Sequence, residues 1–310
     1  MSYKRLITII IILLFSGNVY AKEKYFDENY IFKPSQKIKW LEKTGTWPIN
    51  WDVHGRQSKT PWALKYSDKI VRDGKYSLRF EKREKDCGVD DCTRVSAKFI
   101  GRSEVTINSK STWGEVGSHW YSSSIYIPEE SNLPTGKGQI IMGQFKTSSK
   151  SQFKTRKHVD GWDGVKNFES CPEINLTIRL NKDGLMSDRQ GVMFCNPWAN
   201  GNGIFHEKFY QKLVDMKTLK GKWNDLIINA NWTDNEEGFI KIWVNGKLKL
   251  DYIGKTISKI KTIDGQKHGA LFRFGIYSQK WPGTIIAYFD NIKRSKVCEK
   301  LIRCQIRQNN

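Results

Sequence analysis

Short segments in which polar and apolar residues alternate recur along this chain, and they constrain its fold more than any other feature. Residues 77–81 (SLRFE) and 175–180 (NLTIRL) alternate in this way, and Asn245-Gly246 is typical of a tight hairpin turn. A period of two residues is that of a β-strand. Helical periodicity is scarce and predicts at most one short helix, at residues 211–219. The pattern predicts an all-β protein, an antiparallel two-sheet sandwich or jelly roll.

The N-terminus has the pattern of an export signal. Two basic residues precede an apolar run over residues 6–15, which is too short to span a membrane. Residues 19–21 (Val-Tyr-Ala) then fit a cleavage site for a signal peptidase. We therefore predict a signal peptide at residues 1–21 and a secreted or periplasmic mature protein. Residues 22–310 contain no linker and no internal repeat, so a single domain is expected.

The charge of the chain indicates the kind of partner. Its 52 Lys and Arg residues outnumber 32 Asp and Glu residues, a net charge of +20 that attracts polyanions. In an exported protein the expected polyanion is a polysaccharide or a membrane surface rather than nucleic acid. An incidental basic surface on a protein that faces the cell wall has the same composition. We expect a monomer with no membrane span in the mature chain.

Six cysteines, an even number, favour disulfides in an oxidising compartment. Two pairs are closely spaced and can close local loops, which leaves the third pair by elimination, although fifteen pairings are open to six cysteines. No pair of histidines stands near them at the spacing of a zinc site. The expected bridges are Cys87–Cys92, Cys298–Cys304 and Cys171–Cys195.

Three of the expected strands carry long polar side chains on one face. These faces consist of Arg102 and Glu104, of Gln144 and Lys146, and of Arg273, Gly275, Tyr277 and Gln279. In the third strand the alternate positions are Phe272, Phe274 and Ile276, which are typical of a core. Each polar face alone is commonplace, since an Arg and a Glu on one strand usually form a surface ion pair. Their repetition on three strands predicts a polar groove.

In this order the three segments resemble the signature segments of the jelly-roll alginate lyases, R-[ST]-E-L, Q-[IV]-H and Y-F-K-A-G-x-Y-x-Q. Four further segments are similar to the heparin lyase I-like and glucuronan lyase-like enzymes: residues 120–128 (WYSSSIYIP), 221–226 (GKWNDL), 242–247 (IWVNGK) and 288–292 (YFDNI). The resemblance covers about residues 71–294. It implies a concanavalin A-like β-jelly roll and a polysaccharide lyase that requires no cofactor for its chemistry and no catalytic metal. It also allows a structural calcium ion, although no loop of oxygen ligands marks one.

The resemblance assigns roles to the polar residues. Such a lyase cleaves a uronate polymer by β-elimination, in which the proton at C5 is removed and the oxygen at C4 departs. Arg102 and Gln144 are expected to bind the substrate carboxylate, and Tyr277 to transfer a proton. Arg273 stands where the family usually has Lys. We expect Glu104 to orient Arg102.

Lys146 departs from the pattern, because the family has a histidine there as the base. Neighbouring arginines disfavour a charged Lys146, so it can serve as the base, or it can be a fixed cation that binds substrate. His119 or His158 are alternatives for the missing imidazole, but a histidine packed within a strand and a solvated loop residue are equally compatible with the sequence. Further substrate contacts are expected from the remaining basic, amide and aromatic candidates: Arg79, Arg179, Arg273, Gln279, His158, Trp162 and Trp198.

Two other functions fit a sandwich of this kind. A glycoside hydrolase needs two positioned carboxylates, and the chain has no E-x-D-x-E strand to supply them. A lectin-like module that binds an anionic polysaccharide without cutting it is the more serious alternative, and the missing histidine favours it. The joint presence of Arg102, Gln144 and Tyr277 favours the lyase.

Overall fold

The computed structural model describes residues 51–54, 62–84, 86, 101–107, 114–135, 138–147, 174–189, 209–257, 261–263, 266–279, 283–301 and 303–304. These residues form sixteen β-strands and two short 3-10 helices, η4 (Met216–Thr218) and η5 (Cys298–Lys300). The predicted all-β class is therefore confirmed. In this part of the chain no helix is long and apolar enough to cross a membrane.

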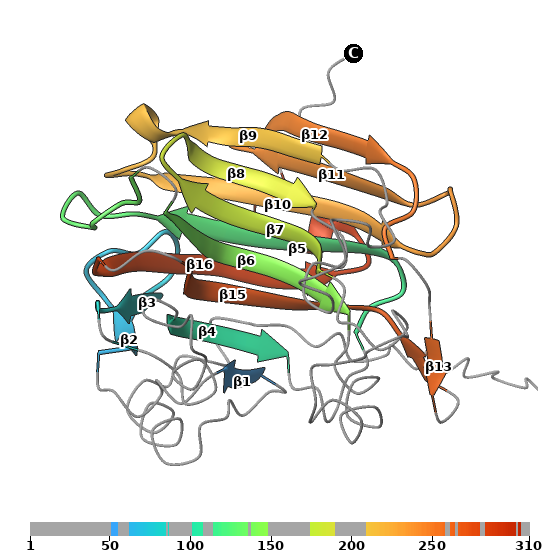
Figure 1. Cartoon of the computed structure of the whole chain (residues 1–310), viewed down its shortest axis with the longest axis horizontal. Coiled ribbons are helices and arrows are strands. Elements are labelled where there is room, and N and C mark those ends of the chain that lie inside the picture. Colours follow the sequence, from blue (N-terminus) through green and yellow to red (C-terminus); the bar gives the residue numbers. More distant parts are fainter. Residues whose placement is uncertain are drawn as a thin grey trace, which may run out of the picture.

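Fourteen of the strands form two antiparallel sheets of seven strands, which lie one behind the other in Figure 1. Sheet A has the order β1 (Trp51–His54), β4 (Gly101–Ile107), β15 (Ala270–Gln279), β6 (Gln139–Thr147), β7 (Ile174–Asn181), β8 (Gly184–Arg189) and β9 (Phe209–Asp215). Sheet B has the order β12 (Lys247–Ile253), β11 (Phe239–Val244), β10 (Trp223–Trp232), β5 (Gly117–Tyr126), β16 (Ile285–Ser295), β3 (Ser77–Lys82) and β2 (Leu64–Ser67). A separate hairpin joins β13 (Lys261–Ile263) and β14 (Gln266–His268).

The connections are those of a jelly roll. Strand β15, late in the chain, lies between β4 and β6, and β5 lies between β10 and β16. Strands that are distant in the sequence are thus neighbours in both sheets. The predicted two-sheet jelly roll is confirmed, and its two faces sort the side chains of each strand into inward and outward sets.

The core between the sheets is aromatic. The ring centroids of Phe145 and Phe272, from neighbouring strands of sheet A, are 4.7 Å apart and the rings are stacked. Tyr121 of sheet B packs edge-on against Phe145, and its hydroxyl accepts a hydrogen bond of 2.8 Å from Trp232. Burial of each such side chain stabilises the fold by about 1.5–3 kcal/mol. Because β15 points Phe272, Phe274 and Ile276 into this core, its alternate residues face away from it.

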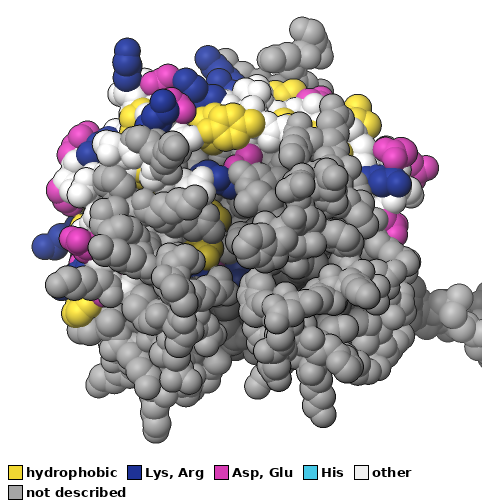
Figure 2. Space-filling view, in the orientation of Figure 1, with side chains coloured by type: hydrophobic (Ala, Val, Ile, Leu, Met, Phe, Trp, Pro, Cys, Tyr) yellow, Lys and Arg dark blue, Asp and Glu magenta, His cyan; other side chains and the backbone are white. Residues whose placement is uncertain are grey.

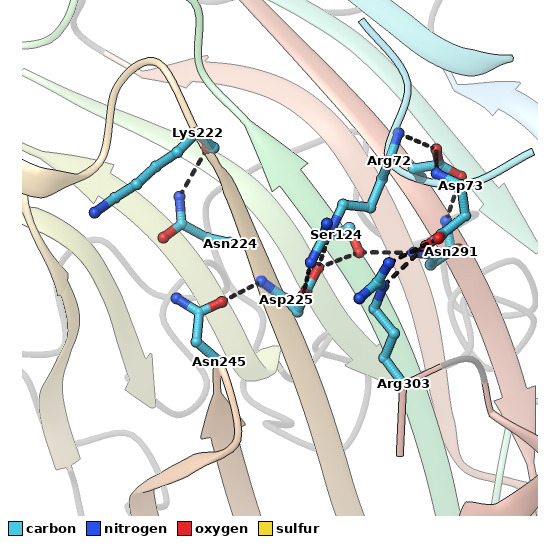
Figure 3. A network of polar contacts seen from close by, with 10 residues as sticks. Arg72, Asp73, Ser124, Lys222, Asn224, Asp225, Asn245, Asn291 and Arg303 are labelled. Carbon is cyan, nitrogen blue, oxygen red and sulfur yellow. Dashed lines mark hydrogen bonds and ion pairs between the residues drawn. The ribbon is translucent and has the colours of Figure 1, made fainter. Parts of the chain in front are cut away.

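A polar network covers the face of sheet B that points away from the core (Figure 3). Arg72 forms two hydrogen bonds with Asp225 of β10, at 2.7 and 3.0 Å, and the hydroxyl of Ser124 donates to the same carboxylate. Arg303, near the C-terminus, forms a second two-bond pair with Asp73. Hydrogen bonds from Arg303 lower the pKa of Asp73. The network ties residues 72–73 and the C-terminal segment to the middle of sheet B.

A disulfide closes the C-terminal segment. The predicted Cys298–Cys304 bridge is present and packs against Ile227 and Trp243 on the same face of sheet B. The predicted Cys87–Cys92 and Cys171–Cys195 bridges lie outside the described residues, as does the predicted signal peptide. The single domain over residues 22–310 stays a prediction.

Candidate active site

The face of sheet A that points away from the core, here called the outer face of sheet A, collects most of the predicted site residues. Arg273 and Tyr277 face it because they alternate with the core residues of β15. Tyr277 is in register with Arg102 of β4, and Arg273 is in register with Gln144 of β6. Residues in register on antiparallel strands share a face. The four residues therefore lie together on three adjacent strands.

A bulge in β15 shapes the centre of this cluster. The register between β15 and β6 shifts between Phe274 and Tyr277, and Gly275 in the shifted stretch has a φ of +125°. A Cβ atom at Gly275 would clash with the backbone oxygen of Ser103. Glycine is therefore required at this position. An added Cβ would also lie 2.9 Å from the Cα atom of Glu104, with which Gly275 is in register.

Glu104 is the hub of the cluster. Its side chain is only 1% exposed, and its Oε1 atom accepts a hydrogen bond of 2.5 Å from Nε2 of Gln144. Its Oε2 atom lies 3.6 Å from Nη1 of Arg102. The Arg102 guanidinium in turn lies over the ring of Tyr277, 4.2 Å from the ring centroid. One buried carboxylate thus fixes an arginine and an amide beside a tyrosine.

Arg273 adds a second buried cation. It is 7% exposed, and its Nε atom makes no hydrogen bond within the described part of the chain. Burial lowers the pKa of Arg273; the Glu104 carboxylate opposes that shift, and Arg102 adds to it. An arginine stays charged even so. Two guanidinium groups next to one carboxylate leave a net positive charge, which suits an anionic ligand.

Lys146 is at the edge of the cluster. It lies two residues beyond Gln144 on β6 and is half-buried. In Figure 2 basic side chains are visible beside an acidic one in the middle of this face of the molecule. Because Lys146 alternates with the core residue Phe145, it extends the row of polar side chains along β6.

Arg179 shares the face but is held by other side chains. Arg179 is on β7, and β6 separates it from β15. Ile141 of β6 is in register with Tyr277 on one side and with Arg179 on the other. Its Nη2 atom lies 2.8 Å from Oδ2 of Asp188 on β8, and its Nη1 atom donates to Gln139. Asp188 and Gln139 were not among the predicted site residues. In β8, Met186 and Asp188 alternate with residues that face the core. This alternation could have predicted that Asp188 lies on the outer face.

Two predicted residues lie on the other sheet. His119 is on β5 of sheet B, where Nε2 is 2.7 Å from Oε2 of Glu115 and Nδ1 is 3.1 Å from the oxygen of Gly117. Arg79, on β3 of sheet B, has its Nη2 atom 2.6 Å from Oε2 of Glu81. The structure brings neither residue to the cluster, because both belong to strands that lie across the core from it.

The other candidates are not placed. Gln279 ends β15, and its backbone is in register with Gln139. His158, Trp162 and Trp198 lie outside the described residues. Within those residues no group of three or more His, Cys, Asp or Glu side chains is arranged to hold a metal ion, so the expectation of a structural calcium ion stays untested.

A family model for the sequence decides the class of protein. The model described as "Polysaccharide lyase" matches residues 42–293. The chain belongs to the polysaccharide lyase family. No curated protein sequence matches this lyase at a significant level.

Solved structures share the fold of the lyase. The endo-beta-1,4-glucuronan lyase from the fungus Trichoderma reesei is 13% identical, with a TM-score of 0.53, and the match covers 81% of this chain and 96% of that one. The alginate lyase Aly36B is 14% identical, with a TM-score of 0.47 and coverages of 79% and 87%. The alginate lyase vAL-1 from Chlorella virus is 15% identical, with a TM-score of 0.46 and coverages of 80% and 93%. The lyase is thus similar in fold to the glucuronan lyase.

Proposed function

We propose that this polysaccharide lyase cleaves a uronate-containing polysaccharide by β-elimination, with the cluster on the outer face of sheet A as its active site. One observation supports this above all. Arg102 and Gln144, from two different strands, lie against the buried carboxylate of Glu104, and Arg102 also lies over the ring of Tyr277 from the strand between them. A binding surface for polyanions needs cations, but it does not need a buried amide and a phenol in contact with them.

The first requirement of the reaction is to make the C5 proton acidic. That proton is lost more easily when the adjacent carboxylate is neutralised, because the negative charge then spreads into an enolate-like group. Arg102 presents a guanidinium for the carboxylate. Gln144 has one N–H bound to Glu104, which leaves its second N–H for the substrate. Arg273, in register with Gln144, adds a second positive charge to the cluster.

The second requirement is proton transfer to the leaving oxygen. Tyr277 is 8% exposed, on the same face as Arg102, whose guanidinium covers one side of its ring. We assign its hydroxyl as the acid that protonates O4 when the C4–O4 bond breaks. The nearby cation stabilises the phenolate that results. Lys146 is assigned to the same groove, as the base or as a cation that binds the next uronate.

A panel of polymers tests the proposal. The purified protein is incubated with alginate, glucuronan and heparin, and the ultraviolet absorbance of the unsaturated uronate product is followed. We expect at least one polymer to give this product. If no uronate polymer does, while one still binds, the proposal is wrong for this chain.

We also propose that the mature protein is exported. The apolar run near the N-terminus and the Cys298–Cys304 bridge support an oxidising compartment. N-terminal sequencing of the protein recovered from the periplasm or the medium is expected to begin near Lys22. If the protein is instead recovered from the cytoplasm with Met1 still at its N-terminus, the proposed export is wrong.

A further inference from the structure

We propose that His54, on the edge strand β1, is the base that removes the C5 proton, an inference that rests on the proposed function. Strand β1 lies beside β4 at the end of sheet A and pairs with it in an antiparallel ladder of four residues. In this ladder His54 is in register with Glu104, the hub of the cluster. The cluster has Lys146 on β6 where the family has a histidine. Strand β1 instead brings a histidine position next to the cluster.

The register places this position on the outer face of sheet A. Residues in register on antiparallel strands share a face, and Glu104 contacts Gln144 and Arg102 on the outer face. The preceding pair, Val53 with Val105, falls on the opposite face, where Val105 is fully buried in the core. The sequence of β1, Trp-Asp-Val-His, alternates apolar and polar residues with the period of a strand.

The spacing across the sheet suits a sugar between a base and an acid. Neighbouring strands are about 4.8 Å apart, so β1 and β15 are separated by roughly 10 Å. Arg102 of β4 lies between the two strands, next to Tyr277. A uronate whose carboxylate is bound by Arg102 and Gln144 then has the His54 position on one side and the Tyr277 hydroxyl on the other.

The chemistry favours an imidazole over the other candidates. An unperturbed histidine has a pKa of about 6.5 and is largely neutral near pH 7, whereas an unperturbed lysine, at about 10.4, is almost fully protonated. Lys146 would need a large shift to act as a base. Of the five histidines in the sequence, His119 lies on sheet B, against Glu115. His54 is the position that the ladder brings next to Glu104.

The step balances without any other reactant. A neutral imidazole nitrogen of His54 takes the C5 proton, and the electrons of the C5–H bond form the C4=C5 double bond. The C4–O4 bond breaks, and O4 takes its proton from the Tyr277 hydroxyl. The imidazolium then returns a proton to the Tyr277 phenolate through solvent, which restores both residues.

The test compares His54→Ala and His54→Gln with the native enzyme on whichever uronate polymer the native enzyme cleaves. We expect kcat to fall on the order of 100 to 10,000-fold in both variants, with KM much less affected. The acidic limb of the pH–rate profile, which reports the base, is expected to disappear. Added imidazole is expected to restore part of the activity of His54→Ala. His119→Gln, which replaces an imidazole on sheet B, is the control and should keep the acidic limb.

The outcomes separate the two proposals. If the native enzyme releases no unsaturated uronate from any polymer, the proposed function fails, whatever the variants do. If the native enzyme is active and both His54 variants keep kcat and the acidic limb, His54 is not the base. If the limb is lost in Lys146→Ala instead, the base is Lys146 and the inference is overturned. A variant that loses activity through misfolding would show a lowered Tm and no response to imidazole. In that case the His54 variant with the higher Tm is used to judge whether His54 is the base.

Discussion

Gln144 donates a hydrogen bond of 2.5 Å to Glu104 although strand β15 lies between their two strands. Gly275, the residue of β15 in register with Glu104, lies so close to β4 that an added Cβ would be 2.9 Å from the Cα atom of Glu104. Glu104 also lies 3.6 Å from Arg102, so it contacts both groups that are proposed to bind the substrate carboxylate. The geometry of the site therefore depends on a residue that contributes no functional group.

Gly275→Ala is expected to damage both the fold and the site. The added methyl group would clash with the backbone of β4, and the φ of +125° is strained for any residue with a Cβ. We expect a loss of roughly 1–3 kcal/mol in the free energy of unfolding and a fall in kcat/KM. Gly143→Ala on β6 is the matched control, because the nearest atom to its new Cβ would be 3.6 Å away. Equal behaviour of the two variants in urea unfolding would count against this account.

Tyr277→Phe is expected to abolish most of the activity. The change keeps the ring under the Arg102 guanidinium but removes the proton that O4 would receive. The loss of a general acid typically lowers kcat on the order of 100 to 10,000-fold. Tyr252→Phe, which loses a hydroxyl bound to the oxygen of Lys255 on sheet B, should keep the native kcat. Full activity in Tyr277→Phe on the cleaved polymer would remove Tyr277 from the mechanism.

Lys146→Ala is expected to separate the two roles that are open to this residue. If Lys146 only binds the polyanion, KM rises and the rate at saturating substrate largely persists. If it is the base, kcat falls while binding survives. Lys146→Arg keeps the charge and should restore KM in the first case alone. Since His54 is proposed as the base, we expect the first result in steady-state kinetics.

His119 is expected to make the fold sensitive to acid. Burial of the ring, with Lys296 nearby, lowers the pKa of His119 to about 4 from the ordinary 6.5, against the opposing effect of the Gly117 carbonyl. As the pH falls, the unfolded chain takes up this proton first. The contribution to stability is therefore complete above pH 6.5 and is lost between pH 6.5 and 4. It amounts to about 3 kcal/mol.

Urea unfolding as a function of pH checks the prediction for His119. The variant His119→Gln cannot titrate, so its free energy of unfolding should fall less between pH 6.5 and 4 than that of the native protein. Parallel curves for the two proteins would show that another group causes the loss.

Local patterns predicted the faces of the strands, but they could not predict which strands become neighbours. Alternation in β15 correctly separated Phe272 and Phe274 from Tyr277, because that separation depends only on the backbone of one strand. Alternation in β5 and β3 could not tell that His119 and Arg79 belong to the other sheet. The pairing of β1 with β4 joins segments that are about fifty residues apart, and no local signal specifies it. The bulge at Gly275 occurs in the pairing of β15 with β6, and no local signal specifies that pairing either.

The network of Arg72, Asp225, Arg303 and Asp73 lies on sheet B, on the opposite side of the core from the cluster around Glu104. The two groups of residues share no contact partner. Substitutions in one and in the other should therefore change the free energy of unfolding nearly additively. A chain built in this way can accept substitutions on the outer face of sheet A while sheet B continues to stabilise the fold. For engineering, the outer positions of β7, β8 and β9 can therefore be varied without any change to the network on sheet B.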